Sequence, residues 1–579
     1  MLGIWRWLRS HGLRRAARSG RMRLARPSEK DARSYPGTYQ YCRDWCADRG
    51  LLLPLRKFGW LPTRLRERGL HEAPAGGLAK WLDASIPVFL GVCAFGLVLS
   101  LLDPFGLARA SKAQSERLSA RLLAPFYESD AQSQIAVVLI DDLALDRHGM
   151  AWPLRYSEYE ALVRRVLAHA PRAVYLDVLL EQARSYDDSR EDAVADLHAQ
   201  LSAPLIDGRT TPPVFFGVSA PDRRSIFSMP GGVQDVATSW QGVGGDYPLR
   251  LDPKTVYAAD WRAEEPRMRE DDPRYRSVAL TLYEVACAEL AAPGCAQTAD
   301  RLDIDAQRHP LSVQWGAMQP TVAAGHDVSP CMRTSSPTPG ERWATMARLA
   351  WRSLLSGLSE RSEETGRTAC AYPLTVHMEQ LSDSRLLRQD DTTPGLLENR
   401  VVLIGTHLIG LDDRVLSPVH QQIPGVFLHA MALDNLMTWG DRRIHRVEGM
   451  GVALDVLTAM LMSLACGAVL VQPWSRPVRW LMLCIAPVAV GIGMIFLSQY
   501  GLRQPPQDWL GVLWLAWAMA IYLHQRLRGT KDHHKERHDA WKDDADPSLH
   551  VAGVDAGGND AGERTGDDGS GGTGLRQPG

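Results

Sequence analysis

The first 26 residues of the chain contain no aspartate or glutamate, although eight of them are arginine. A segment with this charge favours an anionic partner, either lipid or nucleic acid. The first eighty residues hold 18 lysines and arginines against 6 acidic residues, whereas the whole chain has a net charge of −2. Because a long apolar segment follows, we expect a basic cytoplasmic arm over residues 1–83 that faces lipid, and no nucleic-acid partner.

Charged residues are also missing, or nearly so, from four apolar stretches. Residues 85–102, 480–498 and 509–523 contain none, and residues 449–472 contain only Asp455. Since about 20 apolar residues cross the hydrocarbon layer, we expect four transmembrane helices, at 84–102, 447–472, 479–498 and 508–525. The first is not a cleavable signal peptide, because it begins about eighty residues into the chain and no small-residue cleavage site follows it closely.

The distribution of lysine and arginine predicts the topology. The arginine-rich arm should stay in the cytoplasm, so residues 103–446 should be extracytoplasmic and both termini cytoplasmic. Basic residues also occur at 476 and 479 and beyond 525, which fall inside in this topology. The tail 526–579 has almost no apolar side chain to bury, and we therefore expect it to be disordered.

Cysteine is scarce, with nine in 579 residues. The pair Cys42 and Cys46 could bind a metal by its spacing but lacks partner ligands, so no metal site is expected. Three cysteines lie in the apolar stretches. The four in the outer region suggest two disulfides in an oxidising compartment, and among three pairings we favour Cys287 with Cys295 and Cys331 with Cys370.

The outer region has the pattern of an α/β domain. Continuous apolar runs at 135–140, 173–176, 214–218 and 401–405 are typical of buried strands, and helical patterns at 157–170 and 190–202 separate the first three. Ser157 and Glu160 have the spacing of a capping box. This alternation predicts a largely parallel sheet with flanking helices. Between 276 and 359 we expect helices at 276–290 and 341–359, with short strands at 302–305 and 311–314.

Acidic side chains follow several of the predicted strands. Asp141, Asp142 and Asp177 end two strands, and Asp413 and Arg414 follow another. Ligands bind outside the carboxyl ends of parallel strands, so one interpretation is a small-ligand or cation site. The alternative is that these residues cap helices or form an Asp413–Arg414 or Asp177–Arg155 ion pair. A metal-dependent hydrolase is a further hypothesis, but we expect no catalytic residue, metal or cofactor.

The junction with the membrane provides candidate coupling residues. A helix over about 427–447, which includes His429 and Asn435, is predicted to run directly into the bilayer, and the connector 105–123 should enter it from the same domain. Asp455 is the one ionisable residue inside a predicted span. Such a residue either pairs in the bundle interior or reaches the outer interface, and the sequence favours neither.

Several blocks resemble the second type of CHASE domain, the extracellular sensory domain associated with cyclases and histidine kinases. The residues that carry the resemblance are Ile140-Asp141-Asp142, Trp152-Pro153-Leu154-Arg155, Ala173–Leu179 and the stretch from Val401 through Asp413-Arg414 and Pro424-Gly425 to Asn435. The resemblance implies an α/β sensory domain between one span and typically three others. It also implies a sensory protein of the bacterial inner membrane that responds to an unknown ligand or envelope state.

The polar tail departs from the pattern of that family. It contains no Gly-rich nucleotide loop, phosphoacceptor helix or cyclase-like block. We therefore expect signalling through a separate cytoplasmic partner, and a homodimer is compatible with this layout. A non-sensing scaffold that assembles a membrane complex is the alternative hypothesis from another class of function.

Overall fold

The computed structural model describes residues 77–103, 106–203, 211–230, 232–238, 246–251, 273–288, 293–296, 310–322, 331–356, 370–382, 395–411, 413–445, 447, 450–505 and 511–522. The predictions for the basic arm, the pair Cys42 and Cys46, the strand 302–305 and the tail 526–579 lie outside these residues.

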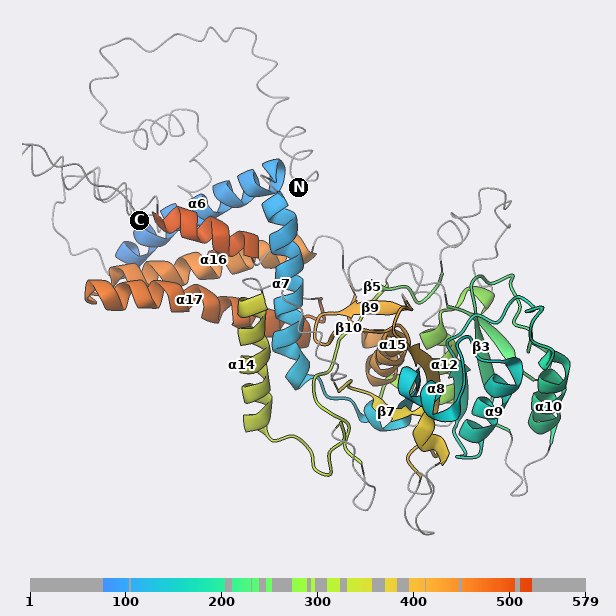
Figure 1. The fold of residues 1–579 in the computed structure, drawn as a ribbon. Coiled ribbons are helices and arrows are strands. Elements are labelled where there is room, and N and C mark those ends of the chain that lie inside the picture. The colour runs from blue at the N-terminus through green and yellow to red at the C-terminus, as the bar shows by residue number, and fades with distance from the viewer. Residues whose placement is uncertain are drawn as a thin grey trace, which may run out of the picture. The chain divides into compact units, whose positions relative to one another are not determined.

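A six-stranded parallel sheet forms the centre of the outer region (Figure 1). Its strand order is β4-β3-β2-β8-β1-β7, and every neighbouring pair is parallel. The strands are β1 (Ile135–Asp141), β2 (Ala173–Leu176), β3 (Val214–Val218), β4 (Gln234–Ala237), β7 (Leu374–His377) and β8 (Val401–His407). The predicted α/β class with a largely parallel sheet is therefore correct, and the four strands read from the sequence are all present.

Helices cover both faces of this sheet, which explains why its central strands β1, β2 and β8 are almost continuously apolar. Successive side chains of a strand point to opposite faces, so Val137 and Leu139 enter one core while Ala136 and Val138 enter the other. The first core includes α12 (Val278–Cys287) and α15 (Val426–Trp439). The second includes α8 (Asp142–His148), α9 (Tyr156–Leu167) and α10 (Arg190–Ser202).

Smaller elements complete the outer region. Two antiparallel pairs join β9 (Arg414–Ser417) to β10 (Gln421–Pro424) and β5 (Asp246–Tyr247) to β6 (Leu311–Ser312). Disulfides join Cys287 to Cys295 and Cys331 to Cys370, the pairing favoured from the sequence. The short 3-10 helices are η3 (Ala124–Phe126), η4 (Asp130–Gln134), η5 (Pro273–Tyr275), η6 (Pro293–Ala296), η7 (Met378–Ser382) and η9 (Gly440–Arg442).

The start of α9 differs from the predicted capping box. The helix begins at Tyr156, and the carboxylate of Glu158 accepts a hydrogen bond from the backbone N–H of Arg155 at 2.7 Å. Glu160 lies one turn further on and forms an ion pair with Arg164 at 3.2 Å. The capping residues are therefore two positions before those proposed.

Two helices are long and apolar enough to cross a membrane. They are α16 (Met450–Val471) and the segment Pro477–Gly501, which combines α17 (Arg476–Phe496) with the π-helical turn η10 (Leu497–Gly501). The first and fourth predicted spans are helical as well, but their apolar parts, Ala84–Leu99 within α6 (Gly77–Leu102) and Gly511–Tyr522, are shorter than a full span. Among the described residues, two of the four predicted spans are thus long and apolar enough to cross a membrane.

The junction helix does not run directly into the membrane as the sequence suggested. α15 ends at Trp439, and Gly440 has a φ of 55°, a left-handed value that favours glycine and breaks the helix. The chain then forms η9, and residues 443–445 are not helical; α16 begins at Met450. The continuous coupler over 427–447 is therefore wrong, and any coupling must pass through contacts between separate helices.

The other connection to the membrane helices is α7 (Leu107–Leu123), which follows α6. Its C-terminal half lies beside α14 (Pro339–Ser356) in Figure 1, and the two helices are in contact there. The predicted connector 105–123 and the predicted helix 341–359 correspond to these two elements. Both predictions are accurate to within a few residues.

Candidate functional site

The carboxyl ends of the parallel strands meet at one edge of the sheet, where the predicted acidic residues lie. β1 ends at Asp141 beside His407 of β8, with which it is in register. Asp177 follows β2 on the other side of β8, so the central strand separates the two acids. The five predicted residues share an edge but form two groups instead of one cluster.

The first group is centred on Asp141. Its Oδ1 accepts a hydrogen bond from the N–H of Ala144 at 2.8 Å and so caps α8, and its Oδ2 lies 2.6 Å from Nδ1 of His377. Burial alone would raise the pKa of Asp141, but the hydrogen bonds with His377 and Ala144 lower it. Conversely, the hydrogen bond to Asp141 raises the pKa of His377. These contacts are those of the capping alternative.

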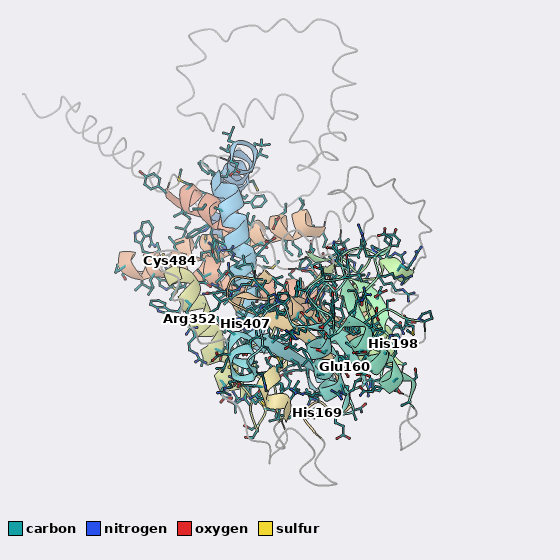
Figure 2. The ribbon with its side chains drawn as sticks, turned by 45° about the vertical axis from the view of Figure 1, so that its right-hand side comes forward. Glu160, His169, His198, Arg352, His407 and Cys484 are labelled. Carbon is teal, nitrogen blue, oxygen red and sulfur yellow. A yellow bond between two sulfur atoms is a disulfide. The ribbon has the colours of Figure 1, made fainter. Side chains whose placement is uncertain are left out.

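Asp142 and Arg414 complete this group. Oδ2 of Asp142 accepts a hydrogen bond from the N–H of Ile409 at 2.9 Å, which holds the loop after β8 against α8. Burial, followed by the charge of Arg414, lowers the pKa of His407, which Figure 2 labels. Among the described residues, neither the Asp413–Arg414 nor the Asp177–Arg155 ion pair forms.

We predict that Asp141→Asn lowers the pKa of His377, because the carboxylate that stabilises the imidazolium is removed. A raised folded-state pKa adds stability below the ordinary histidine pKa that is lost as the pH rises through the folded value. The variant should therefore lose this part of the stability below neutral pH. Residue-resolved histidine deuterium exchange measures the shift, and the pKa of His169, which lies against Leu381, should be unchanged. An unchanged His377 pKa would contradict the pairing.

The second group lies between the end of β2 and the first turn of α15. Tyr175 donates a hydrogen bond from its hydroxyl to Oδ1 of Asp177 at 2.9 Å, and the hydroxyl of Tyr247 lies 2.8 Å from Nδ1 of His429. The ring of His429 packs edge-on against both tyrosines. Asp413 lies close by, since a Cβ added at Gly425 would come 2.5 Å from its Oδ1.

Burial controls the charges in this second group. Although Asp177 keeps some contact with solvent, protein atoms surround its carboxyl group and raise the pKa to about 6. Burial and the neighbouring charge of Asp177 raise the pKa of Asp413 as well. Burial lowers the pKa of His429 to about 4, so this histidine is neutral at physiological pH. Asp177 and Asp413 are thus protonated more readily than an ordinary aspartate, whereas His429 is neutral.

A small hollow of about 10 Å³, enough for about one water molecule, lies next to His429 and Tyr247, and Thr238 and Ser277 contribute hydroxyl groups to its wall. It is lined otherwise by Ala237, Pro248 and Leu251. In the part of the chain that the structure describes, no three histidine, cysteine or acidic side chains are placed to hold a metal ion. The chemistry of this group is therefore that of hydrogen bonds and of groups that titrate near neutral pH.

A chain of buried polar side chains, which we call the relay, connects α15 to the end of α17. It consists of Asp434, Tyr127, Asn435, Gln314 and Gln499. Asn435 of α15 donates hydrogen bonds from Nδ2 to the hydroxyl of Tyr127 at 2.9 Å and to the carbonyl of Gln314 at 3.1 Å. Its Oδ1 accepts one from the N–H of Gln314 at 2.7 Å. The side chain of Gln314 then accepts a hydrogen bond from Nε2 of Gln499 at 2.6 Å. Gln499 lies in η10, directly after α17.

Asp434 is the acidic end of the relay. Its Oδ2 accepts a hydrogen bond from the Tyr127 hydroxyl, and its Oδ1 accepts one from Ser129 Oγ at 2.9 Å. The residue is 1 % exposed, and burial raises its pKa to about 7 despite both hydrogen bonds. The relay, defined as Asp434, Tyr127, Asn435, Gln314 and Gln499, thus contains one group that changes charge near neutral pH.

The sequence identified only part of this arrangement. Asn435 was a predicted coupling residue and lies in the middle of the relay, whereas His429 faces the sheet edge and Asp455 lies half-buried in the second turn of α16. Asp434 precedes Asn435 directly and was missed, as were Gln314 and Gln499. An acidic residue in an otherwise apolar helix was the available signal for Asp434, whereas single glutamines carry none.

The comparisons with known proteins agree with this architecture. A family model described as the CHASE2 domain matches residues 92–470, from within α6 to the end of α16. No curated protein and no solved structure matches the chain. CHASE2 domains are extracellular sensory domains of signalling proteins. Since the match covers well over half of the sequence, this chain belongs to the CHASE2 family.

Proposed function

We propose that this chain is a multi-pass sensor of the bacterial inner membrane. Residues 103–446 are periplasmic in this proposal, four helices cross the bilayer, and both termini are cytoplasmic. The domain responds to a small ligand or to the state of the envelope and passes the change to a separate cytoplasmic partner. Support comes from the CHASE2 family and from two helices of membrane-spanning length and composition.

The relay is the observation that carries the proposal. It joins α15, which packs on the sheet, to the outer end of α17 through side chains that are all less than 7 % exposed, Gln314 and Gln499 among them. Hydrogen bonds in a buried polar chain polarise one another, so a shift of one member favours a new arrangement of the others. Oε1 of Gln499 is buried and has no hydrogen-bond partner among the described residues, so the last member of the relay could gain a partner in such an arrangement. Two arrangements of similar free energy are what a sensor needs. A scaffold that only assembles partners has no such requirement.

The group around Asp177 and Asp413 is the part of the domain that we propose as the sensory site. Both carboxyl groups have raised pKa values, and Asp413 lies near enough to His429, which lines the small hollow, for each to affect the pKa of the other. A ligand that carries a positive charge or donates hydrogen bonds would be favoured there, because it would stabilise the ionised carboxylates. His429 places this site on the same helix as Asp434 and Asn435 of the relay. We propose no catalytic step and no cofactor.

Two measurements on the full chain in lipid nanodiscs test this function. The first is a thermal-shift screen against divalent cations and small metabolites, with Asp177→Ala and Asp413→Ala as variants. A ligand at one hundred times its dissociation constant should stabilise the folded state by about 2.7 kcal/mol. A hit that both variants abolish, and that Asp130→Ala retains, supports the site. A hit that neither variant changes would mean that the ligand binds elsewhere in the chain.

The second measurement tests the coupling. The protection of the amides over Leu497–Gly501 from deuterium exchange, expressed relative to an unfolded chain at the same pH, should change when the full chain is titrated from pH 8 to pH 6. The reason is that Asp434 titrates in this range. We predict that Gln499→Leu abolishes the response in this segment while leaving exchange in the sheet unchanged, because the variant breaks the final hydrogen bond of the relay. Gln422→Leu, at an exposed position of β10, is the matched control. An unaltered response in Gln499→Leu would exclude the relay as the route.

A further inference from the structure

We propose that α14 lies in the headgroup region of the outer lipid leaflet, with Trp343, Ala347 and Trp351 facing lipid. This inference rests on the membrane topology proposed above and adds a second contact between the domain and the bilayer. The chain would then be held at the membrane by its spans and also by a helix from the middle of the sensory domain.

One face of α14 is occupied by protein. Met346 and Ala350 pack into a cluster with Leu118, Leu122 and Leu123 of α7 and with Ile492 and Ile495 of α17. The guanidinium of Arg121 on α7 donates a hydrogen bond to Ser353 Oγ at 2.6 Å on the same side. α14 is therefore attached to the outer half of α17, which is one of the two helices of membrane-spanning length.

The rest of the helix surface divides into an apolar sector and a charged sector. Trp343 and Trp351 are 52 % and 62 % exposed, and Ala347 between them is also exposed. These three positions are four residues apart, and at about 100° per residue they fall within a single sector next to the packed face. Arg348 and Arg352 are exposed further around the helix, and Figure 2 labels Arg352.

This division matches a helix that lies in a lipid interface. Such helices bury tryptophan and other apolar side chains at the boundary with the acyl chains and keep arginines at the level of the phosphates. Tryptophan is enriched at both membrane surfaces for the same reason. In water, by contrast, two indole rings about two turns apart and the alanine between them would form an exposed apolar strip on one helix, which a soluble surface seldom tolerates.

An aromatic cluster joins α14 to the end of α17 and so sets the depth of α14 in the bilayer relative to that span. Trp343 packs edge-on against Phe126 with ring centres 4.9 Å apart, and Phe126 packs against Phe496 at 5.3 Å. Phe496 stacks on Tyr500, whose hydroxyl donates a hydrogen bond to the carbonyl of Phe126 at 3.1 Å. Tyr500 and the adjacent Leu497 are 49 % and 45 % exposed, so the outer surface of the span continues into the exposed sector of α14.

Spin labels on the full chain in nanodiscs test the inference. The five cysteines outside the disulfides are first replaced by alanine, namely Cys42, Cys46, Cys93, Cys466 and Cys484. Single labels are then attached at Ala347→Cys in the apolar sector and Arg352→Cys in the charged sector. A third label at Val488→Cys, 45 % exposed on α17, reports on the span itself.

Collision with oxygen, which concentrates in lipid, is compared with collision with a water-soluble nickel chelate. We expect the oxygen-to-nickel ratio at position 347 to resemble that at 488 and to exceed that at 352 several-fold. A lipid-like ratio at 488 with a water-like ratio at 347 would overturn the inference and leave the topology intact. A water-like ratio at 488 would overturn the topology.

A second copy of the chain is the competing occupant of this face. In that case the label at 347 would be shielded from both reagents and would show spin–spin broadening between molecules. Dilution of labelled with unlabelled protein would remove this broadening. That outcome also overturns the proposal of a lipid contact.

Discussion

Asn435→Leu is expected to destabilise the outer domain more than any other single substitution in the relay. Asn435 is fully buried and serves three hydrogen bonds at once, two of them with the backbone of Gln314. Leucine fills a similar volume but leaves the N–H and the carbonyl of Gln314 without these partners. Each buried group that loses its partner costs about 1–3 kcal/mol, so the free energy of unfolding should fall by about 2–6 kcal/mol.

Thermal unfolding of the full chain, followed by circular dichroism in nanodiscs, measures this effect. For a domain of this size the midpoint should fall by roughly 10 °C. Gln422→Leu introduces the same side chain at an exposed position and should leave the midpoint unchanged. A midpoint in Asn435→Leu that equals that of the control would mean that water or a rearranged side chain satisfies Gln314, and the relay would lose its central member.

The second large effect concerns pH. Burial raises the pKa of Asp434 from the ordinary aspartate value of 3.8 to about 7 in the folded state. Between these values the folded protein binds a proton that the unfolded chain has released. The free energy of unfolding should therefore fall as the pH rises from 4 to 7, and the total change corresponds to about 4 kcal/mol.

Asp434→Asn removes this dependence. The amide oxygen can still accept a hydrogen bond from Tyr127, and Ser129 Oγ can accept one from the new amide nitrogen. The variant should therefore match the native protein near pH 4 and become more stable than it by several kcal/mol at pH 8. Denaturant unfolding at a series of pH values tests this, with the exposed Asp130→Asn as control. Equal pH dependence in both variants would contradict a neutral, buried Asp434.

The sheet was predictable because its signal is local. Runs such as 135–140 and 401–405 are apolar on every residue, which only a strand covered on both faces requires, and the acids that follow them mark the strand ends. β7 and β4 were missed, since Leu374–His377 and Gln234–Ala237 each bury only part of their side chains. Short edge strands have little apolar pattern, and their assignment depends on neighbours distant in sequence.

The candidate site was less predictable than the fold. The sequence correctly placed Asp141 and Asp177 at one edge of a sheet, but their separation depends on which strand lies between them, and the order of strands is not a local property. Similarly, Gln314 and Gln499 are distant in sequence from Asn435 and meet it only through tertiary packing. The break at Gly440 was missed although the local signal was present, since this glycine directly follows the apolar part of the helix and charged residues occupy 441–443.

The central position of β8 has a consequence for biogenesis. β8 is the last strand of the sheet to be synthesised, yet it lies between β2 and β1, and Ile135 pairs with Val401. Strands β1 to β4 therefore cannot complete their sheet until the chain has been synthesised almost as far as α15. During that interval two apolar strand edges remain unpaired, which exposes the nascent domain to aggregation. Pairing at such sequence separation is also slow, so the insertion of β8 should limit the rate at which the sheet forms.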